Sequence, residues 1–89
     1  MFEWDEAKNK SNLEKHGISF DDVVEVFDDP FAITREDTDH DEQRFFTVGQ
    51  AKYLVVVAVA YSYEEAALRI ISARRATKTE RKYYEQKKR

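Results

Sequence analysis

From residue 31 onward, apolar and polar residues alternate with a period of two in several short stretches. Successive side chains of an extended strand point to opposite faces of a sheet, so this period predicts strands. In the second of these stretches, Arg44, Phe46 and Val48 share one face. The third stretch is nearly continuous Val and Ala, which is typical of a central strand covered on both faces. Short connections favour antiparallel pairing of consecutive strands. The predicted strands are residues 31–35, 43–48, 53–61 and 66–74.

Helix signals occupy the first thirty residues. Asp5 can cap a helix that runs to about His16, and Gly17 can take the left-handed conformation that closes it. Ser19 caps a second, shorter helix whose apolar residues recur at helical spacing. Its end is expected at residues 28–30, because proline disfavours helical geometry at the residue before it. The apolar stripe of this helix consists of Phe20, Val23, Val24 and Phe27.

Residues 68–89 change from a strand signal to the signal of a basic helix. Thr77 and Glu80 have the spacing of a capping box and predict where this third helix begins. From Arg74 onward the chain carries eight basic residues and two acidic ones. Arg74 and Arg75 at the end of the strand, beside the N-terminus of a basic helix, would form a cradle for phosphate. The alternative interpretation is a solvated, charged helix face.

These signals together predict an α+β fold with the element order α-α-β-β-β-β-α. A four-stranded antiparallel sheet would carry the two N-terminal helices on one face and would be followed by one C-terminal helix. With 89 residues, the chain is expected to form a single domain, residues 1–89, with one modest hydrophobic core.

Composition and charge exclude several classes of protein. The chain has no cysteine, which rules out disulfides and zinc sites built on thiolates. The N-terminus lacks the apolar stretch of a signal peptide, and the longest apolar run is shorter than the ~20 residues of a membrane-spanning helix. We therefore expect a soluble, cytoplasmic protein. The net charge of −3 divides unevenly, since residues 1–42 carry −10 and residues 43–89 carry +7. Such asymmetry indicates a charged partner or internal pairing.

The acidic loop between the first two predicted strands has the opening of a calcium-binding loop. That loop type would require glycine and glutamate where the chain has Glu42 and Val48. We interpret the loop as solvated charge and expect no metal site and no cofactor. The residues considered as ligands are Asp37, Asp39, His40 and Asp41.

Cationic and phenolic side chains are the remaining candidates for chemistry, because no Ser–His–Asp or Cys–His pattern and no glycine-rich phosphate loop is present. This inventory suits the cleavage of RNA by its own 2′-hydroxyl, for which the protein supplies a base, an acid and cations. His16 is the natural titrating group, although a histidine beside a helix-ending glycine can instead be a partner of the helix dipole. The candidates are Lys8, His16, Arg44, Arg69, Arg74, Arg75, Arg81, Tyr83 and Tyr84.

Two motifs lie at opposite ends of the chain. The first, WDxxKxxxNxxKHGxxF, comprises Trp4, Asp5, Lys8, Asn12, Lys15, His16, Gly17 and Phe20. The second, RIISARxAT…ER…YE, comprises Arg69, Ser72, Arg74, Thr77, Glu80, Arg81, Tyr84 and Glu85. In this order they resemble the BrnT toxins of type II toxin–antitoxin systems, and the likeness covers nearly the whole chain.

The resemblance implies a RelE-like ribonuclease fold and metal-independent endoribonuclease cleavage of mRNA that arrests growth. It also implies neutralisation by a cognate antitoxin that carries a DNA-binding domain, with promoter DNA bound only through the complex of the two. By analogy with that fold, catalysis would use dispersed basic and aromatic side chains. From our candidates we expect Arg74 and Arg75 on the phosphate, Lys8 and His16 near the proton transfers, and Tyr84 as an auxiliary ring or acid. The corresponding RNA-binding residues are Arg44, Arg69, Lys78 and Arg81.

Two other functions use the same basic residues. A non-catalytic nucleic-acid-binding or corepressor module, acting only in complex with a partner, would need the cations but no proton-transfer groups. A basic C-terminal helix with few apolar residues would also suit docking of an acidic or amphipathic partner segment.

Overall fold

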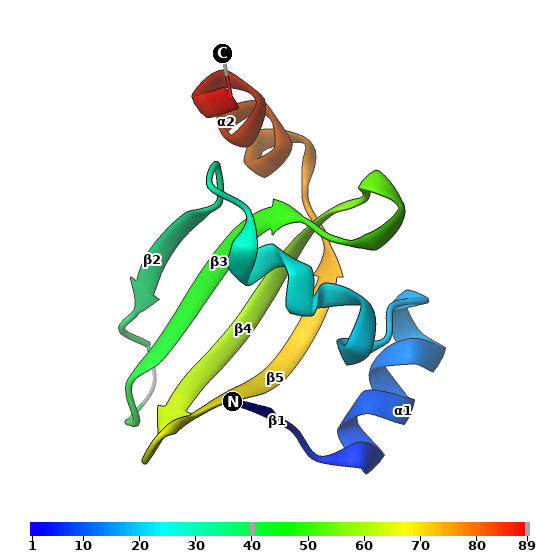
Figure 1. The fold of residues 1–89 in the computed structure, drawn as a ribbon, viewed down its shortest axis with the longest axis vertical. Coiled ribbons are helices and arrows are strands. Elements are labelled where there is room, and N and C mark those ends of the chain that lie inside the picture. The colour runs from blue at the N-terminus through cyan, green and yellow to red at the C-terminus, as the bar shows by residue number, and fades with distance from the viewer. Residues whose placement is uncertain (40, 89) are drawn as a thin grey trace.

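The computed structural model describes residues 1–39 and 41–88, and it is built on one five-stranded sheet with the order β1-β5-β4-β3-β2 (Figure 1). Consecutive long strands pair in antiparallel fashion, as the short connections predict. His40, part of the acidic loop considered for metal binding, and Arg89, part of the basic tail, lie outside the described residues. The long strands are β2 (Ile33–Asp37), β3 (Arg44–Gln50), β4 (Val56–Glu64) and β5 (Ala67–Arg75).

A fifth strand, β1 (Phe2–Glu3), makes the sheet mixed. It pairs in parallel with β5, and the backbone N–H of Leu68 donates to the carbonyl of Met1 at 2.9 Å. The prediction of a four-stranded, wholly antiparallel sheet is therefore wrong at this edge, and the element order begins with a strand. Two residues are too few to show a period of two, so only the partner strand defines β1.

The third predicted strand begins later and ends later than its apolar run suggests. Residues Lys52–Leu54 form a 3₁₀ turn, η2, in which Tyr53 and Leu54 have φ angles of 61° and 62°. Both side chains are 79% exposed, so neither belongs to the core. Strand β4 then continues through residues 62–64, which lie between the third and fourth predicted strands, and the chain reverses at Glu65 with φ 55°.

The local helix signals are confirmed. Helix α1 (Glu6–His16) is capped by Asp5, whose side chain accepts from the N–H groups of the first turn, and is closed by Gly17 at φ 70°. At the C-terminal helix α2 (Lys78–Lys88), Thr77 and Glu80 form the predicted capping box, with hydrogen bonds of 2.8 and 3.1 Å. None of the helices in the described part of the chain has the length and apolarity needed to cross a bilayer.

The second helix, η1 (Phe20–Asp28), is a 3₁₀ helix capped by Ser19. Its fully buried residues are Phe20, Val23 and Val26, so the buried stripe recurs every third residue. This is the spacing of a 3₁₀ helix, in which side chains three apart are eclipsed. The predicted stripe had the α-helical spacing, and its members Val24 and Phe27 are only half-buried.

Two buried asparagines fasten α1 to the rest of the molecule. The Asn12 side chain donates to the carbonyls of Ile18 and Ala73 at 2.9 and 2.8 Å and accepts from the N–H of Ala73 at 3.1 Å. Asn9 accepts from the N–H of Phe20 at 2.8 Å. Polar side chains therefore anchor a helix whose apolar residues are few.

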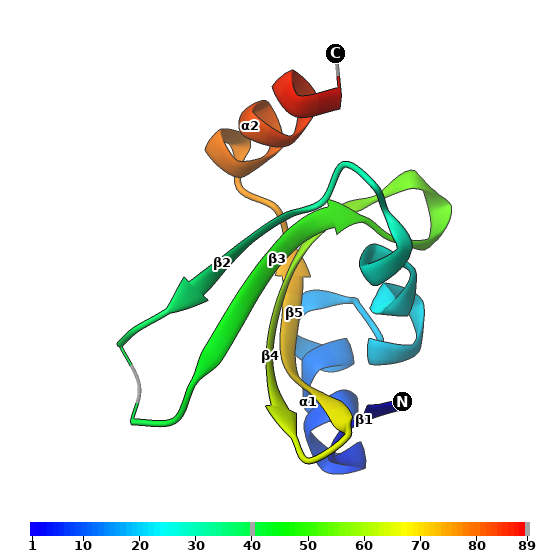
Figure 2. The same ribbon diagram turned by 60° about the vertical axis from the view of Figure 1, so that its left-hand side comes forward.

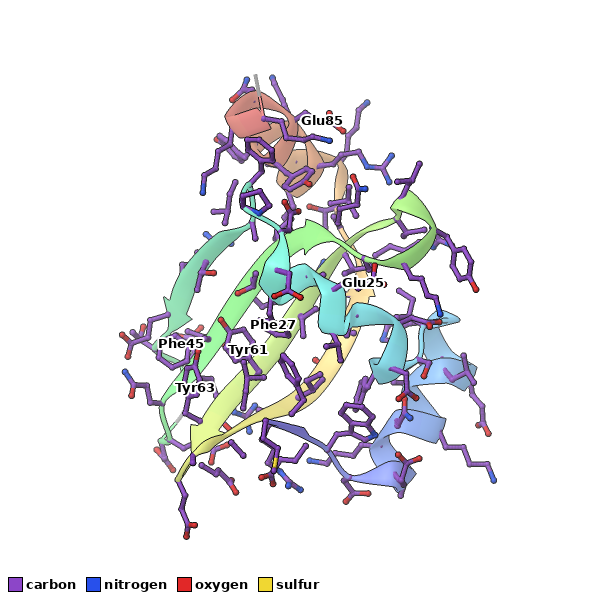
Figure 3. All side chains as sticks on the ribbon, viewed as in Figure 1. Glu25, Phe27, Phe45, Tyr61, Tyr63 and Glu85 are labelled. Atoms are coloured by element: carbon purple, nitrogen blue, oxygen red, sulfur yellow. The ribbon has the colours of Figure 1, made fainter. Side chains whose placement is uncertain are left out.

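The helices divide unequally between the two faces of the sheet (Figure 2). Helices α1 and η1 lie on one face, over the larger core. Aromatic rings continue this side toward β3, with centroids 4.9 to 5.8 Å apart in the series Phe27, Tyr61 and Phe45 (Figure 3). On the other face, α2 covers only one end of the sheet, where Tyr84 packs on Val48. The rest of that second face is covered by no described helix.

Candidate functional site

The partly covered face of the sheet gathers arginine side chains from three strands. Side chains alternate along each strand, and the registers of the pairs β2–β3, β3–β4 and β4–β5 put these arginines on the face where Val48 packs beneath α2. We call it the arginine face. Its arginines are Arg35, Arg44, Arg69 and Arg74.

Arg74 is held at the junction of β5 and α2. Its Nη1 and Nη2 donate to Oε1 and Oε2 of Glu80 at 2.8 and 3.0 Å, which is the bidentate geometry of a strong ion pair. Its guanidinium also lies 5.1 Å from the centroid of the Phe46 ring. The same Glu80 carboxylate accepts from the backbone N–H of Thr77, so the cap of α2 and the position of Arg74 depend on one side chain.

This ion pair shifts the pKa of both partners. Hydrogen bonds from Arg74, together with the cap of Thr77, hold the pKa of Glu80 at about 2 although burial opposes them. The hydrogen bonds to Glu80 raise the pKa of Arg74 above its ordinary value. At neutral pH Glu80 is therefore a carboxylate, and it is too weak a base to accept a proton in catalysis.

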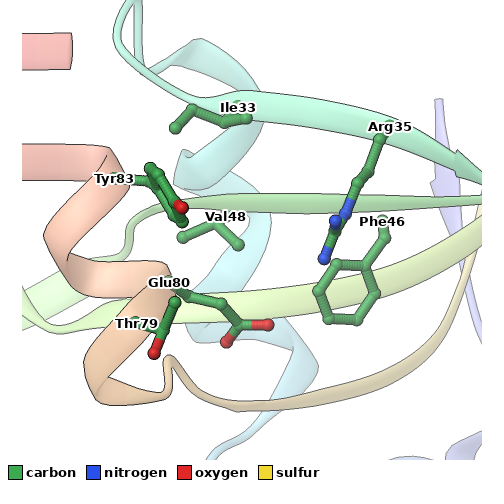
Figure 4. A pocket seen from close by; sticks show the side chains of 7 residues that line it. All are labelled: Ile33, Arg35, Phe46, Val48, Thr79, Glu80 and Tyr83. Atoms are coloured by element: carbon green, nitrogen blue, oxygen red, sulfur yellow. The ribbon is translucent and has the colours of Figure 1, made fainter. Parts of the chain in front are cut away.

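Two hollows adjoin on the arginine face. The first has a volume of about 400 Å³ and lies between β2, β3 and the first turns of α2 (Figure 4). The second has a volume of about 350 Å³ and extends toward the connection between β2 and β3. Arg35, Phe46 and Glu80 line both, so the two hollows share a wall.

The arginines of this face differ in whether they have an ion-pair partner. Arg44 pairs with Glu42 at 2.9 Å, and Arg69 pairs with Glu3 of β1 at 2.7 Å. The side chain of Arg35 makes no ion pair or hydrogen bond with any described residue. Its guanidinium donors are therefore available to a ligand in either hollow. Arginine forks match phosphate oxygens, and on this face they stand beside the carboxylates of Glu36, Asp37, Asp39 and Glu80, which line the second hollow.

The chain matches one family of toxins over most of its length. Residues 4–80 match the family of the ribonuclease toxin BrnT of type II toxin–antitoxin systems. The chain belongs to the BrnT family. A crystal structure of the Brucella abortus ribonuclease toxin BrnT superposes with a TM-score of 0.69 at 30% sequence identity, covering 88% of this chain and 99% of that one. No protein of curated function matched the chain. A type II toxin of this family implies an antitoxin as its partner.

The prediction that Arg74 and Arg75 together form one phosphate cradle is wrong. Strand β5 extends through Arg75, so adjacent side chains point to opposite faces. Arg75 pairs in register with Val57 of the larger core and, with Gly17, lines a hollow of about 180 Å³ on the side of α1. The sequence-based boundary placed the end of the strand at Arg74, which removed the alternation that separates the two side chains.

The structure gives Tyr84 a packing role. Its side chain is 1% exposed and donates to Oδ2 of Asp29 at 2.6 Å. Burial, reinforced by this hydrogen bond, raises the pKa of the Tyr84 hydroxyl. Burial opposes ionisation of Asp29, but hydrogen bonds from Tyr84 and the backbone outweigh it and lower the pKa of Asp29. Because the Tyr84 side chain is buried and its hydroxyl is bound to Asp29, the site that we propose does not include Tyr84.

Lys8 and His16 lie across the sheet from the arginine face. Both are exposed residues of α1, which packs on the opposite face through its asparagines. The structure therefore does not bring them together with Arg74. Lys78 and Arg81 are exposed on α2, the helix that borders the arginine face.

Arg35 and Phe46 have positions in the site that sequence reasoning did not assign to them. Their common face follows from the pairing of Arg35 with Phe46 in the β2–β3 register. The signal available in the sequence was that Arg35 is two residues from the inward-facing Ile33. Among the described residues, no group of three or more His, Cys, Asp or Glu side chains is placed to hold a metal ion.

Proposed function

We propose that this BrnT-family chain is an endoribonuclease that cleaves mRNA on the arginine face, without a metal ion, and thereby arrests growth in the cytoplasm. We further propose that its antitoxin carries a DNA-binding domain and that the two proteins bind their promoter together. The observation that carries the nuclease proposal is the convergence on the second hollow of Arg74 and of Arg35, whose side chain has no ion pair or hydrogen bond with a described residue.

The chemistry proposed is attack by the 2′-hydroxyl of RNA on the adjacent phosphorus, with expulsion of the 5′-oxygen of the next nucleotide. The products are a 2′,3′-cyclic phosphate and a free 5′-hydroxyl, with the proton of the 2′-hydroxyl passing to solvent and the 5′-oxygen taking one from solvent. Arginine donors stabilise the charge that develops on the phosphoryl oxygens, and electrostatic stabilisation of this kind is usually the largest single term in catalysis. Arg35 and Arg74 have this role, and Arg44, Arg69, Lys78 and Arg81 contact the flanking backbone.

The two neighbouring arginines at the end of β5 provide a matched test. Purified protein is incubated with a defined RNA in the presence of EDTA, and the product ends are mapped. Arg74→Ala should lower the cleavage rate roughly 10²-fold or more, as expected for a lost donor to the transition state. Arg75→Ala removes the same charge from the opposite face and should leave the rate within a few-fold of wild type.

A requirement for a divalent ion, or equal effects of the two variants, would refute the proposed site. Circular dichroism of both variants separates loss of chemistry from loss of fold. Arg35→Ala is a useful third variant, because the Arg35 side chain has no partner among the described residues and its removal breaks no described hydrogen bond or ion pair.

The second candidate function is a nucleic-acid-binding or corepressor module that acts only with its partner. It is favoured by one observation, that the only described histidine lies across the sheet from the arginines. In this case the wild-type chain would bind RNA with a steep dependence on salt and leave it intact.

A further inference from the structure

The first hollow of the arginine face has the composition of a small-molecule site. Its floor is formed by Ile33 and Val48, and aromatic rings stand at its two ends, Phe46 from β3 and Tyr83 from α2 (Figure 4). Its volume of about 400 Å³ falls in the ~300–1,000 Å³ range of sites for small ligands. It lies outside the packed core beneath α2, where Tyr84 fills the space against Val48.

Tyr83 presents an exposed aromatic ring at this hollow. Tyr83 is 62% exposed, although it lies on the same helix as the buried Tyr84 and borders an apolar floor. Phe46, at the other end, is held in place by the guanidinium of Arg74 at 5.1 Å from its ring centroid. Two rings and an aliphatic floor can therefore receive a flat apolar group from solvent.

Charge next to the hollow indicates what that flat group belongs to. Arg35 lines both the apolar hollow and the neighbouring polar one. Arg74 lines the polar one, which is also lined by the carboxylates of Glu36, Asp37, Asp39 and Glu80. A ligand that places a planar group on the apolar floor thus brings an attached anion to two guanidiniums. An unpaired nucleotide has this combination, a base with a π face joined to a phosphate.

We propose that this hollow, bounded by Tyr83, Phe46, Ile33 and Val48, binds one unpaired nucleobase of an RNA strand while Arg35 and Arg74 hold the adjacent phosphate. The proposal deepens the nuclease function and rests on it for the identity of the polymer. Tyr83 is a binding residue that stacks on the base, and the Thr79 hydroxyl at the rim can hydrogen-bond to a base edge.

The test uses a fluorescent 2′-O-methyl oligoribonucleotide, which lacks the attacking hydroxyl and so reports binding without cleavage. A companion series carries a single abasic position that is moved along the strand. For the wild-type protein, we expect one abasic position to weaken binding roughly tenfold, the loss typical of one aromatic–base stack. Tyr83→Ala should weaken binding of the intact oligonucleotide by a similar factor, and it should have little further effect on the oligonucleotide with that abasic position.

Tyr63→Ala is the matched control, because Tyr63 is 61% exposed and contacts the aromatic series on the opposite face of the sheet. Its binding should equal that of wild type, and Tyr83→Phe should retain tight binding. Equal losses for Tyr83→Ala on intact and abasic strands would overturn the proposal, as would tolerance of an abasic site at every position. So would unchanged RNA binding by Tyr83→Ala together with weaker binding of an antitoxin, which would assign the hollow to that partner.

Cleavage and binding measurements together distinguish failure of the nuclease proposal from failure of the nucleobase site. If wild-type protein leaves unmodified RNA intact but still binds with one base-dependent position, the cleavage proposal fails and the nucleobase site stands. If Arg74→Ala abolishes cleavage while Tyr83→Ala changes neither binding nor rate, the nuclease stands and the nucleobase site fails.

Discussion

Replacing Glu80 by glutamine removes the charge that joins α2 to β5. The variant keeps an oxygen that can accept from the N–H of Thr77, so the cap survives, but the bidentate ion pair with Arg74 is lost. The pKa of Glu80 falls from 4.5 to about 2 in the folded protein. At ~1.36 kcal/mol for each pKa unit, this difference corresponds to at most about 3 kcal/mol of stability. Because the Arg74 side chain is 38% exposed, we expect solvent to reduce the loss to roughly half of this upper bound.

The pH dependence of this loss follows from the direction of the pKa shift. A carboxyl whose pKa is lower in the folded chain than in the unfolded chain stabilises the protein fully above its unfolded pKa. The contribution disappears as the pH falls from about 4.5 toward 2. The difference in the free energy of unfolding between wild type and Glu80→Gln should therefore be largest near neutral pH and should shrink over this acidic range.

Urea unfolding followed by circular dichroism at several pH values measures the effect, and urea leaves the ion pair unscreened. Glu85→Gln provides the control on the same helix, since Glu85 is exposed, and its effect should stay within ~0.5 kcal/mol. A Glu80→Gln variant as stable as wild type at neutral pH would refute the reasoning. So would a difference that stays constant down to pH 2.

The structure supports four further predictions. Arg35→Ala should lower the cleavage rate at least tenfold without a change in melting temperature, because its guanidinium has no described partner, and rate and melting measurements on one sample decide this. Tyr84→Phe should cost about 1 kcal/mol in urea unfolding, since the hydrogen bond to Asp29 is lost, and should leave the cleavage rate unchanged. Asn12→Ala should cost about 2–4 kcal/mol, because buried backbone groups lose their partners, and amide exchange should rise first in α1. Gly17→Ala should cost about 1 kcal/mol by thermal unfolding from its φ of 70° alone, since a Cβ there meets nothing within 4 Å.

Local signals in the sequence predicted the positions of the helices well. The caps at Asp5, Gly17, Ser19 and Thr77 each depend on residues within one turn, so the chemistry that makes them is contained in a few consecutive positions. The sequence did not predict that the second helix is a 3₁₀ helix, because the period of its buried stripe depends on what the helix packs against.

Strand ends were predicted less well, and the composition of the site depends on them. Extending β5 by one residue sends Arg75 to the face opposite Arg74. Likewise, Arg35 belongs to the site only because of its register with Phe46, a pairing set by backbone hydrogen bonds between strands. Periodicity within the strand places Arg35 on the same face as Ile33, but it does not say which residue of the neighbouring strand lies beside it.

The amino-acid sequence by itself determined the family, the three helices, the antiparallel order of the four long strands and the excess of cations near the C-terminus. Only the tertiary structure decided that Arg35 joins Arg74, that Lys8, His16 and Arg75 lie on the other side of the sheet, and that Tyr84 is buried against Asp29. The physical reason is that caps and alternation depend on neighbours in the chain. The face on which a side chain meets others depends on strand register and on which helices cover the sheet.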